Sequence, residues 1–521
     1  MSREPTILLT GATGLLGQFL LVDLLRSRCP VAVLARGSRT GSAQDRVEQI
    51  LTRFEESAKR RFPRPVILEG DLTRSGLGLN PGDLRWLANH CGSVIHSAAS
   101  LSFKPAADHP DNEPFRTNVE GTRELLKVCR DAGIEEFHDI SSAYVCGLRE
   151  GRISERDGDF GQSFSNDYEQ SKLTAEQLVH NAGFKSVTVY RPSIVVDPTP
   201  GSLQLGDRTI YYAFNVFRLM TQRFGEFDID QLFPPIGLTG QERKNIVDAG
   251  WVARTIVEIF RRPQLHGTTY HLTNPRGTPL RDLLSAFQDV LQPRRVGSGP
   301  QPHPNNGWGD LTGIVEQFIE TFTPYFRDDP EFDQTHLKHA LSVCKTSSRG
   351  ITNCPEVEKT TLEAIARQQM TSRPPLAVSS TAELSHWHRW VELQTSSQEQ
   401  NLLDNALQNR IPLSRLCLSL TGIHGGTWTC SWKTDFHSGM SELCIETGQV
   451  DVAGDSAYLL ADLWEEILAG RKEIEQAVRT GEILIEAPEI SICGANIAKL
   501  VKIVQSQLKE TGAFSEVSTE V

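Results

Sequence analysis

The chain has 521 residues, of which 39% are hydrophobic and 23% charged, and its formal net charge at pH 7 is −12. This length implies more than one domain and allows a large hydrophobic core. The acidic balance argues against a nucleic-acid-binding protein, and no polybasic segment points to an anionic membrane surface.

The lack of recognisable targeting signals and the distribution of the cysteines predict a cytoplasmic protein. No apolar run approaches the roughly 18 residues needed to span a bilayer. The first five residues lead into a predicted strand without the pattern of a signal peptide. The ten cysteines are scattered without a CxxC pair, which is typical of structural thiols in a reducing compartment.

From about residue 6 to residue 273, short apolar strands alternate with helical patterns, which predicts a doubly wound parallel sheet of Rossmann type. The strands lack a regular alternation of polar and apolar residues, so we expect them to be buried, with helices on both faces of the sheet. Two later segments, 245–247 and 269–272, are predicted as further strands at the far side of this sheet. The other predicted strands are 7–9, 31–34, 66–68, 93–96, 136–141 and 187–190.

A glycine-rich loop follows the first predicted strand and precedes a helix predicted over 18–28. Its sequence is Thr10-Gly11-Ala12-Thr13-Gly14-Leu15-Leu16-Gly17. Gly11 permits a tight turn, Gly14 lets backbone N–H groups approach phosphates, and Gly17 lets the helix pack closely on the strand. The loop predicts a site for the pyrophosphate of a dinucleotide.

Tyr168 and Lys172 lie four residues apart, so both project from one face of a predicted helix. A neighbouring ammonium lowers the pKa of a phenol towards the catalytic range, and the same lysine can hold the nicotinamide ribose. This spacing also occurs by chance on solvated helix faces. Ser142, just after a predicted strand, adds a hydroxyl suited to a substrate carbonyl. We therefore predict Ser142, Tyr168 and Lys172 as the catalytic set.

Arg36 ends the second predicted strand, where an acidic residue would bind the ribose hydroxyls of NAD. Its guanidinium suits a 2′-phosphate instead, with Ser38 and Arg39 close by in the sequence. This position predicts NADPH rather than NADH. The alternative is that Arg36 only stacks on the adenine.

Residues 276–375 are predicted as a helical extension with helices over 279–290 and 310–322, and residues 376–394 as a linker. A further folded unit is predicted over 395–510, followed by a flexible tail over 511–521. In that unit a hairpin over 416–420 and 427–432, strands at 444–446 and 482–486, and helices over 458–468, 474–479 and 495–508 are expected.

Several motifs occur together in order along the first 275 residues. Beside the glycine loop and the Tyr168–Lys172 pair, they are Gly70-Asp71-Leu72, His96-Ser97-Ala98-Ala99, Asn118-Val119-Glu120-Gly121-Thr122, Ser141-Ser142-Ala143-Tyr144-Val145 and Tyr190-Arg191-Pro192-Ser193-Ile194. With these motifs the chain resembles the extended short-chain dehydrogenase/reductase superfamily, and within it the thioester-reductase and fatty acyl-CoA reductase branch.

The resemblance implies an NADP-binding domain over residues 1–275 and assigns site residues within it. The catalytic residues would be Ser142, Tyr168 and Lys172. One departure is Asp197, where the family usually has glycine, which puts the local loop in doubt. The implied cofactor-binding residues are Gly11, Thr13, Gly14, Leu15, Leu16, Gly17, Arg36, Asp71, Leu72, Ala98, Tyr168, Lys172, Pro192 and Ser193.

The C-terminal unit resembles a sterol-carrier-protein-type lipid-binding domain. The matching segments are Gly426-Thr427-Trp428, Ala461-Asp462-Leu463-Trp464 up to Gly470, and 477–485. The resemblance implies an α+β domain in which a mixed sheet packs against helices around an apolar tunnel. The alternative is a dimerisation module with an ordinary packed core.

Together these observations predict an NADPH-dependent reductase of a lipid-like acyl thioester, either fatty acyl-CoA or carrier-bound, giving an aldehyde or alcohol. The C-terminal unit would hold the acyl chain or a lipid. One alternative is a dehydrogenase, reductase or epimerase of a sterol-type ketone or alcohol or of a nucleotide sugar. Another is a non-catalytic lipid-transfer or NADP-sensing protein.

The predicted partners are small molecules, with no nucleic acid and no transmembrane segment, and the family resemblance is compatible with a homodimer. No metal site is predicted. His336-Leu337-Lys338-His339 with Cys344 and Cys354 offers metal-ligand residue types, but the spacing of the cysteines fits no common zinc pattern.

Overall fold

The structure is a computed structural model. It describes residues 5–37, 41–102, 106–108, 111–198, 210, 214, 229–231, 233, 238–291, 327–344 and 353–371, and in the C-terminal part 414–421, 426–434, 441–447, 455–460, 467, 484–486 and 501. The chain divides into two compact units. The first contains Met1–Leu203, Leu232–Leu283 and Thr323–Ile365, and the second Gln204–Gln231, Leu284–Phe322 and Ala366–Val521. The segment predicted as a helical extension is thus shared between the two units, and the predicted boundaries at 275 and 375 stay predictions.

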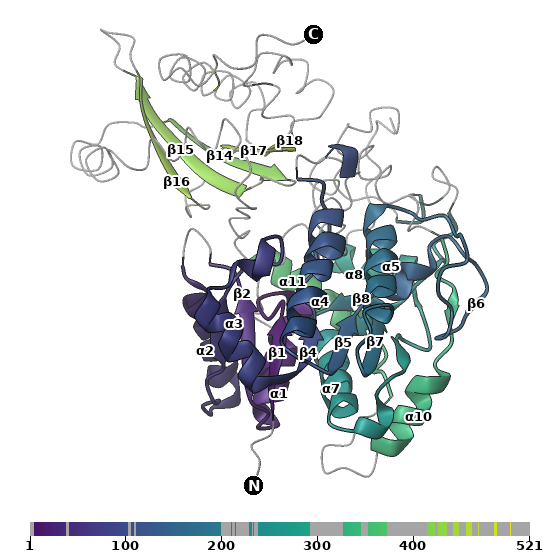
Figure 1. Cartoon of the computed structure of the whole chain (residues 1–521). Helices are drawn as coiled ribbons and strands as arrows, with labels where there is room; N and C mark the ends of the chain where they lie inside the picture. Colours follow the sequence, from purple (N-terminus) through teal and green to yellow (C-terminus); the bar gives the residue numbers. More distant parts are fainter. Residues whose placement is uncertain are drawn as a thin grey trace. The chain divides into compact units, whose positions relative to one another are not determined.

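The first unit is built on a seven-stranded sheet in the order β11-β7-β5-β4-β1-β2-β3, with every neighbouring pair parallel (Figure 1). The chain runs from β1 outward to β3 and then returns to β4 on the other side of β1. The predicted Rossmann-type sheet is therefore confirmed, with its switch point between β1 and β4. The strands are β1 (Thr6–Thr10), β2 (Val31–Ala35), β3 (Val66–Glu69), β4 (Cys91–His96), β5 (Glu136–Ile140), β7 (Ser186–Pro192) and β11 (Thr269–Leu272).

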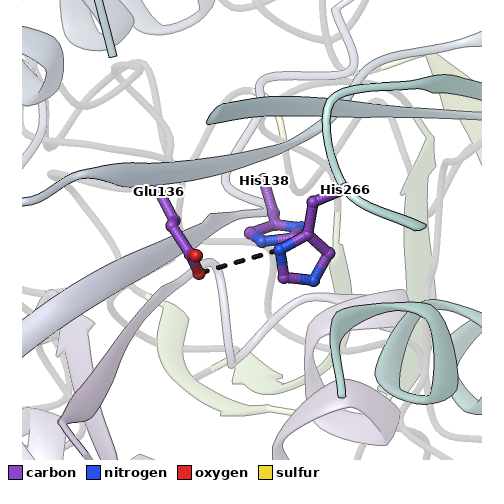
Figure 2. Close-up of side chains that lie close together, drawn as sticks. All are labelled: Glu136, His138 and His266. Atoms are coloured by element: carbon purple, nitrogen blue, oxygen red, sulfur yellow. Dashed lines mark ion pairs between the residues drawn. The ribbon is translucent and has the colours of Figure 1, made fainter. Parts of the chain in front are cut away.

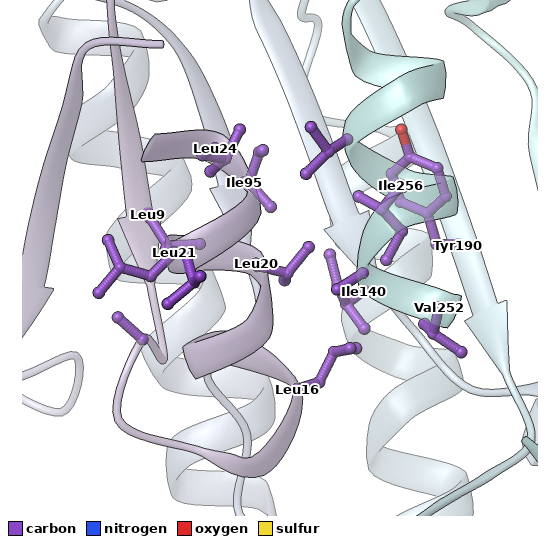
Figure 3. Close-up of a cluster of buried hydrophobic side chains, with 14 of the residues drawn as sticks. Leu9, Leu16, Leu20, Leu21, Leu24, Ile95, Ile140, Tyr190, Val252 and Ile256 are labelled. Atoms are coloured by element: carbon purple, nitrogen blue, oxygen red, sulfur yellow. The ribbon is translucent and has the colours of Figure 1, made fainter. Parts of the chain in front are cut away.

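Helices cover both faces of this sheet, because successive strand residues point to opposite sides and both sides are apolar. Ile7 and Leu9 of β1 pack with α1 (Leu15–Arg26), α2 (Ala43–Ala58), α7 (Ala249–Phe260) and α10 (Thr335–Cys344). Leu8 packs on the other face with α3 (Pro81–His90), α4 (Thr122–Asp131) and α5 (Asp167–His180). In Figure 3, Leu16 and Leu20 of α1 gather with Val252 and Ile256 of α7 over the sheet.

The first helix begins at Leu15 rather than at residue 18, with Gly14 as its N-cap, and ends at Arg26. Arg28 has a φ of 61°, so the helix cannot continue to residue 28 as predicted.

Shorter strands pair outside the main sheet. β8 (Ile194–Val196) is parallel to β10 (Ile246–Asp248), so the prediction that 245–247 extends the main sheet is wrong. Pro192 ends β7, since proline offers no N–H to a strand ladder, and the chain beyond it pairs with β10 instead. The remaining pairs are β6 (Arg152–Ile153) with β13 (Glu331–Phe332) and β9 (Arg243–Lys244) with β12 (Thr278–Pro279).

The other helical segments are α8 (Leu280–Leu291), which confirms the helix predicted over 279–290, and α11 (Lys359–Thr371). A π-helical segment, η3 (Arg116–Gly121), leads into α4. The short 3-10 segments are η1 (Ser75–Gly78), η2 (Ala106–Asp108), η4 (Ala143–Cys146), η5 (Ile229–Gln231) and η7 (Pro263–Leu265). Within the described ranges, no helix combines the length and apolar character that crossing a bilayer requires.

The second unit contains a five-stranded sheet in the order β16-β15-β14-β17-β18. β14 (Ser414–Thr421) and β15 (Gly426–Thr434) are antiparallel neighbours, which confirms the predicted hairpin. β16 (Ser441–Thr447) contains the strand predicted over 444–446, and β18 (Leu484–Glu486) forms the last three residues of the strand predicted over 482–486. β14 is parallel to β17 (Asp455–Leu460) and the other neighbours are antiparallel, so the sheet is mixed.

The helix predicted over 458–468 is wrong at its start, because residues 458–460 belong to β17 and pair with β14. Ile467 and Val501 are helical. The predicted helices over 310–322 and 474–479, the linker over 376–394 and the tail lie outside the described residues, as does most of the helix predicted over 495–508.

Candidate active site

The glycine loop forms a close-packed turn between β1 and α1. Gly11 has a φ of +72°, and a Cβ atom there would lie 2.5 Å from the backbone nitrogen of Ala98. A Cβ on Gly17 would lie 1.9 Å from the carbonyl oxygen of Gly11. The N–H of Gly14 donates to the same oxygen at 2.9 Å, and no side chain caps the first turn of α1. The N–H groups of Leu15, Leu16 and their neighbours are thus presented to an anion, which is what a pyrophosphate requires.

A chain of buried hydrogen bonds ties the ends of β1 and β4 together behind this loop. The hydroxyl oxygen of Thr10 accepts from the N–H groups of Ser97 and Ala98, each at 3.2 Å. The same hydroxyl bonds Nδ1 of His96 at 2.7 Å, and Nε2 of His96 bonds Thr122 at 3.0 Å. Burial lowers the pKa of His96 to about 3, so the ring stays neutral. These hydrogen bonds fix Ala98 against the glycine turn. Ala98 is one of the predicted cofactor-binding residues.

The predicted catalytic residues converge at the carboxyl end of β5. Ser142 is buried and begins η4, where its side chain accepts from the N–H of Tyr144 at 3.2 Å. Tyr168 lies in the first turn of α5, and its hydroxyl is hydrogen-bonded to the side chain of Ser142. Lys172, one turn further along α5, is buried and donates from Nζ to the carbonyl of Ile140 at 2.7 Å. The three residues, 30 positions apart in the sequence at most, thus share one site.

The expected lowering of the Tyr168 pKa is wrong for this geometry. Burial of the hydroxyl raises the pKa of Tyr168 above its usual range, and the hydrogen bond with Ser142 offsets only part of that effect. The ammonium of Lys172 donates to the carbonyl of Ile140. Tyr168 therefore keeps its proton at neutral pH, which suits a hydrogen-bond donor and proton donor.

Asn118 supports the start of α5 from the π-helical segment η3. Its amide nitrogen donates to the hydroxyl of Ser171 at 2.9 Å and to the carbonyl of Ser100 at 3.0 Å. The hydroxyl of Ser171 in turn donates to the carbonyl of Tyr168 at 2.8 Å. Asn118 is thus not simply a helix cap but joins the loop after β4 to the helix that carries Tyr168.

A buried carboxylate escaped the sequence prediction. Asp139 precedes Ile140 in β5, is 1% exposed, and has no hydrogen-bond partner for either oxygen. Burial raises the pKa of Asp139 to about 6, and the charge of Lys172 limits that rise. An acidic residue inside an apolar strand was the available signal. Asp139 supplies negative charge close to the ammonium of Lys172.

A buried ion pair behind the site was also missed. Glu176 of α5 accepts from Arg191 of β7 at 2.5 and 3.1 Å, and from the hydroxyl of Ser141 at 2.6 Å. Arg191 also donates to the carbonyl of Asp157 at 2.7 Å. The guanidinium holds the pKa of Glu176 at about 2 despite its burial. This pair fixes α5 to β5 and β7 four residues beyond Lys172.

The adenosine end carries two arginines. Arg36 follows β2 and lies 3.8 Å from a carboxylate oxygen of Asp71, whose other oxygen accepts from the backbone and hydroxyl of Thr73, both at 2.9 Å. Arg46 of α2 donates to the carbonyl of Arg36 at 2.8 Å and to the hydroxyl of Thr13 at 3.0 Å. Burial and the charge of Arg36 lower the pKa of Arg46, as expected for two neighbouring cations. Sequence reasoning missed Arg46, although it lies one turn into the helix that follows Arg36.

The remaining predicted cofactor residues lie at strand ends along the same edge. Leu72 is buried in the loop after β3. Pro192 ends β7, and the next residue, Ser193, is 7% exposed with a hydroxyl that has no hydrogen-bond partner. A hydroxyl without a partner at this position is available to a polar group of the predicted cofactor. Ser38 and Arg39 lie outside the described residues.

Asp197, the departure from the family pattern, is fully buried beyond β8. Its charge acts on Arg53 of α2 and on Asp248, the N-cap of α7. A carboxylate rather than a glycine at this position therefore interacts with the helices on that face of the sheet.

A glycine cradle lies at the switch point of a parallel sheet, with a tyrosine, a lysine and a serine at the neighbouring strand end, which is the arrangement expected of a Rossmann-type dinucleotide-binding domain. Residues 9–254 match the family described as Male sterility protein, an NAD-binding family. The match covers less than half of the chain and coincides with the part that carries the motifs of the predicted resemblance. It is consistent with the predicted dinucleotide-binding domain.

Two curated relatives are reductases, each matched over only part of its length. The chain is 28% identical over 235 residues to fatty acyl-CoA reductase 1 of Rattus norvegicus, covering 37% of this chain and 45% of that protein. It is 28% identical over 202 residues to a carboxylic acid reductase of Segniliparus rugosus, covering 35% of this chain and 16% of that protein. The chain thus spans less than half the length of either relative. Both relatives are named as reductases, which agrees with the predicted class of enzyme.

Among solved structures, the terminal R domain from the myxalamid PKS-NRPS biosynthetic pathway is similar, with a TM-score of 0.55 and 24% identity over 70% of this chain and 91% of that one. At this identity the likeness establishes the fold.

Proposed function

We propose that the chain is an NADPH-dependent reductase of an acyl thioester with a lipid-like acyl group. The observation that carries the proposal is the pair of hydroxyls from Ser142 and Tyr168, hydrogen-bonded to each other at the end of β5. The likeness to a fatty acyl-CoA reductase supports the thioester as the substrate class.

The two hydroxyls are suited to bind one carbonyl oxygen between them. The side chain of Ser142 accepts from the N–H of Tyr144, which orients its lone pairs. When a carbonyl oxygen binds, the hydrogen bond between the two hydroxyls would be exchanged for one bond from each hydroxyl to that oxygen. A phenol that keeps its proton, as the raised pKa of Tyr168 implies, donates the second hydrogen bond. Both bonds strengthen as negative charge develops on the oxygen, so they stabilise the transition state more than the bound thioester.

A reduced nicotinamide cofactor, held by the glycine loop and by Lys172, would supply the hydride that the carbonyl carbon receives. Tyr168 then passes its proton to the carbonyl oxygen, and the ammonium of Lys172 stabilises the phenolate that is left. The product of this step is a hemithioacetal. Cleavage of its carbon–sulfur bond, with return of the hydroxyl proton to the thiolate, gives the aldehyde and the free thiol.

Incubation of the purified full-length chain with NADPH tests this function. Long-chain acyl-CoA should support NADPH oxidation and release one free thiol for each aldehyde formed. A keto-sterol and a nucleotide sugar serve as the alternative substrates in parallel reactions. NADPH oxidation with the ketone alone, without thiol release from acyl-CoA, would overturn the thioester assignment.

The preference for NADPH over NADH is part of the proposal and depends on Arg36 and Arg46. Two guanidiniums meet near the end of β2, where the 2′-phosphate of NADPH would lie. We expect Arg36→Ser to raise the KM for NADPH by about 10-fold or more and to leave the KM for NADH within about 2-fold, since charge-assisted hydrogen bonds contribute about 1.5–3 kcal/mol. Steady-state kinetics with both cofactors check this prediction.

Arg74→Ser is the matched control, because Arg74 precedes η1 and its replacement removes one arginine without touching β2. Equal changes in the two KM values for Arg36→Ser would contradict the assignment of Arg36 to the 2′-phosphate.

For the second unit, we propose a sterol-carrier-type lipid-binding role, in which it holds the acyl chain of the substrate or the product. The mixed five-stranded sheet supports this role, since the resemblance implies such a sheet. Native mass spectrometry of the full chain should find a co-purifying long-chain lipid. Absence of any bound lipid after added palmitate would favour a packed dimerisation module. The proposal keeps the predicted cytoplasmic location and does not depend on a homodimer.

A further inference from the structure

Two histidines and a glutamate gather at the amino end of β5, away from the candidate active site. Glu136 and His138 are two residues apart in this strand, so their side chains share one face of the sheet. His266 follows η7 and precedes β11. One ligand atom from each of the three residues lies within 4.8 Å of the others, and Figure 2 shows the side chains facing one another.

Each imidazole presents an unused nitrogen to the cluster. The Nε2 atom of His266 lies 2.8 Å from the carbonyl of Phe260, and since a carbonyl only accepts, Nε2 carries the proton. In the neutral ring Nδ1 then bears the lone pair, and it is buried without a hydrogen bond, 3.8 Å from a carboxylate oxygen of Glu136. His138 is 1% exposed; its Nδ1 bonds the hydroxyl of Tyr190 at 3.1 Å, and its Nε2 has no partner.

The cluster thus presents two buried imidazole nitrogens without a hydrogen-bond partner, next to the carboxylate of Glu136. A divalent cation uses both lone pairs and the carboxylate at once.

We propose that Glu136, His138 and His266 bind a zinc ion. Two imidazole nitrogens and one carboxylate are a common zinc donor set, and a water completes four-coordination. Ligand atoms around tetrahedral zinc lie about 3.3 Å apart, so the described atoms need to move together by about 1.5 Å or less. The side chain of Glu136 is 37% exposed, which gives it room to move and gives the ion a route from solvent. Lys185, which pairs with Glu135 at 2.9 Å, also acts on Glu136 and is the competing cation.

The position of the site assigns the ion a structural role. Glu136 begins β5 and Ser142 follows its other end, about 20 Å away along an extended chain. The ion would join β5 to the turn before β11, across the intervening strand β7. The Phe260 carbonyl, and the Tyr190 hydroxyl when it accepts from Nδ1, hold the imidazoles in the tautomers that zinc needs.

Zinc binding to the untagged full-length chain tests the proposal. After dialysis against a chelator, equilibrium dialysis with Zn²⁺ followed by metal analysis should give one tightly bound zinc per chain, and zinc should raise the Tm. Glu136→Gln and His266→Gln should each weaken the affinity by at least about 10-fold, as judged by competition with a chromophoric chelator. The control His90→Gln removes an exposed imidazole of α3 that bonds its own helix and should change neither quantity.

Cobalt(II) distinguishes this site from one built on the cysteines. Absorption of bound Co²⁺ should show the visible bands of a tetrahedral nitrogen–oxygen site without a thiolate charge-transfer band. The proposal is overturned if the chain binds no zinc, if the affinity is unchanged in Glu136→Gln and His266→Gln, or if the thiolate band appears and survives both substitutions. If His266→Gln fails to fold, the zinc affinity of Glu136→Gln alone tests the proposal. This variant should fold, because the partly exposed side chain of Glu136 loses only its charge.

Discussion

Tyr168→Phe is expected to lower kcat for NADPH-dependent thioester reduction by about 10²–10⁴-fold. The substitution removes the hydroxyl that bonds Ser142 and that would pass a proton to the substrate oxygen. The phenyl ring still fills the same space in the first turn of α5, so the fold and the binding of NADPH should be retained. Steady-state kinetics with acyl-CoA, together with NADPH binding followed by cofactor fluorescence, check both parts of the prediction.

Tyr270→Phe is the matched control for this experiment. It deletes the same atom from another buried tyrosine, whose hydroxyl donates to the carbonyl of Leu265 at 2.6 Å in the turn before β11. We expect kcat to stay within about 2-fold of the unmodified chain, with a loss of stability of about 1 kcal/mol. A Tyr168→Phe variant with nearly full activity would show that the proton comes from elsewhere and that Tyr168 is not a catalytic residue.

Much of the first unit could be predicted from the sequence, because its strands are short apolar runs between clear helical patterns. The run at 31–34 and the strand β2 agree almost residue for residue. The polar strand β5, with Glu136, His138 and Asp139 among five residues, could be placed as a strand from its position in the alternating pattern. What each of its side chains meets could not be predicted, since alternate residues face different helices.

The parts that escaped prediction depend on residues far apart in the sequence. His266 reaches His138 from 128 positions away, and no local pattern connects a histidine in a turn with one in a strand. The direction of the Tyr168 pKa was mispredicted for a similar reason. Spacing along a helix places Lys172 on the same face, but only the fold shows that its ammonium donates to the carbonyl of Ile140.

In the second unit, prediction was limited because it used patterns that extend over only a few neighbouring residues. Residues 458–460 follow a helical spacing with the apolar residues after them, which predicted a helix. Pairing with β14 makes them the end of a strand, because tertiary hydrogen bonding outweighs a weak local preference. The hairpin of β14 and β15, in contrast, depends on neighbours in the sequence and was predicted correctly.

Arg191→Met is expected to lower the free energy of unfolding of the first unit by about 3–5 kcal/mol. The side chains of Arg191 and Glu176 are each 3% exposed, so the substitution leaves a carboxylate buried without its cation. The loss of unfolding free energy is measured in the full chain by urea denaturation, with hydrogen exchange of the α5 segment as the readout. The double variant Arg191→Met/Glu176→Leu should recover part of it, because the stranded charge is then gone. A loss below about 1 kcal/mol in the single variant would contradict the prediction.

The ion pair between Arg191 and Glu176 also makes the free energy of unfolding depend on pH. The pKa of Glu176 falls from 4.5 in an unfolded chain to about 2 in the folded one, a difference that corresponds to about 3 kcal/mol. A depressed pKa stabilises the folded state above the unfolded value, so this contribution is complete near pH 6 and declines as the pH falls from about 5 towards 2. Glu176→Gln lacks the ionisable group. The difference in the free energy of unfolding between the unmodified chain and Glu176→Gln should therefore become smaller as the pH falls over this interval. A difference that stays constant down to pH 3 would mean that Glu176 is not the charged partner of Arg191.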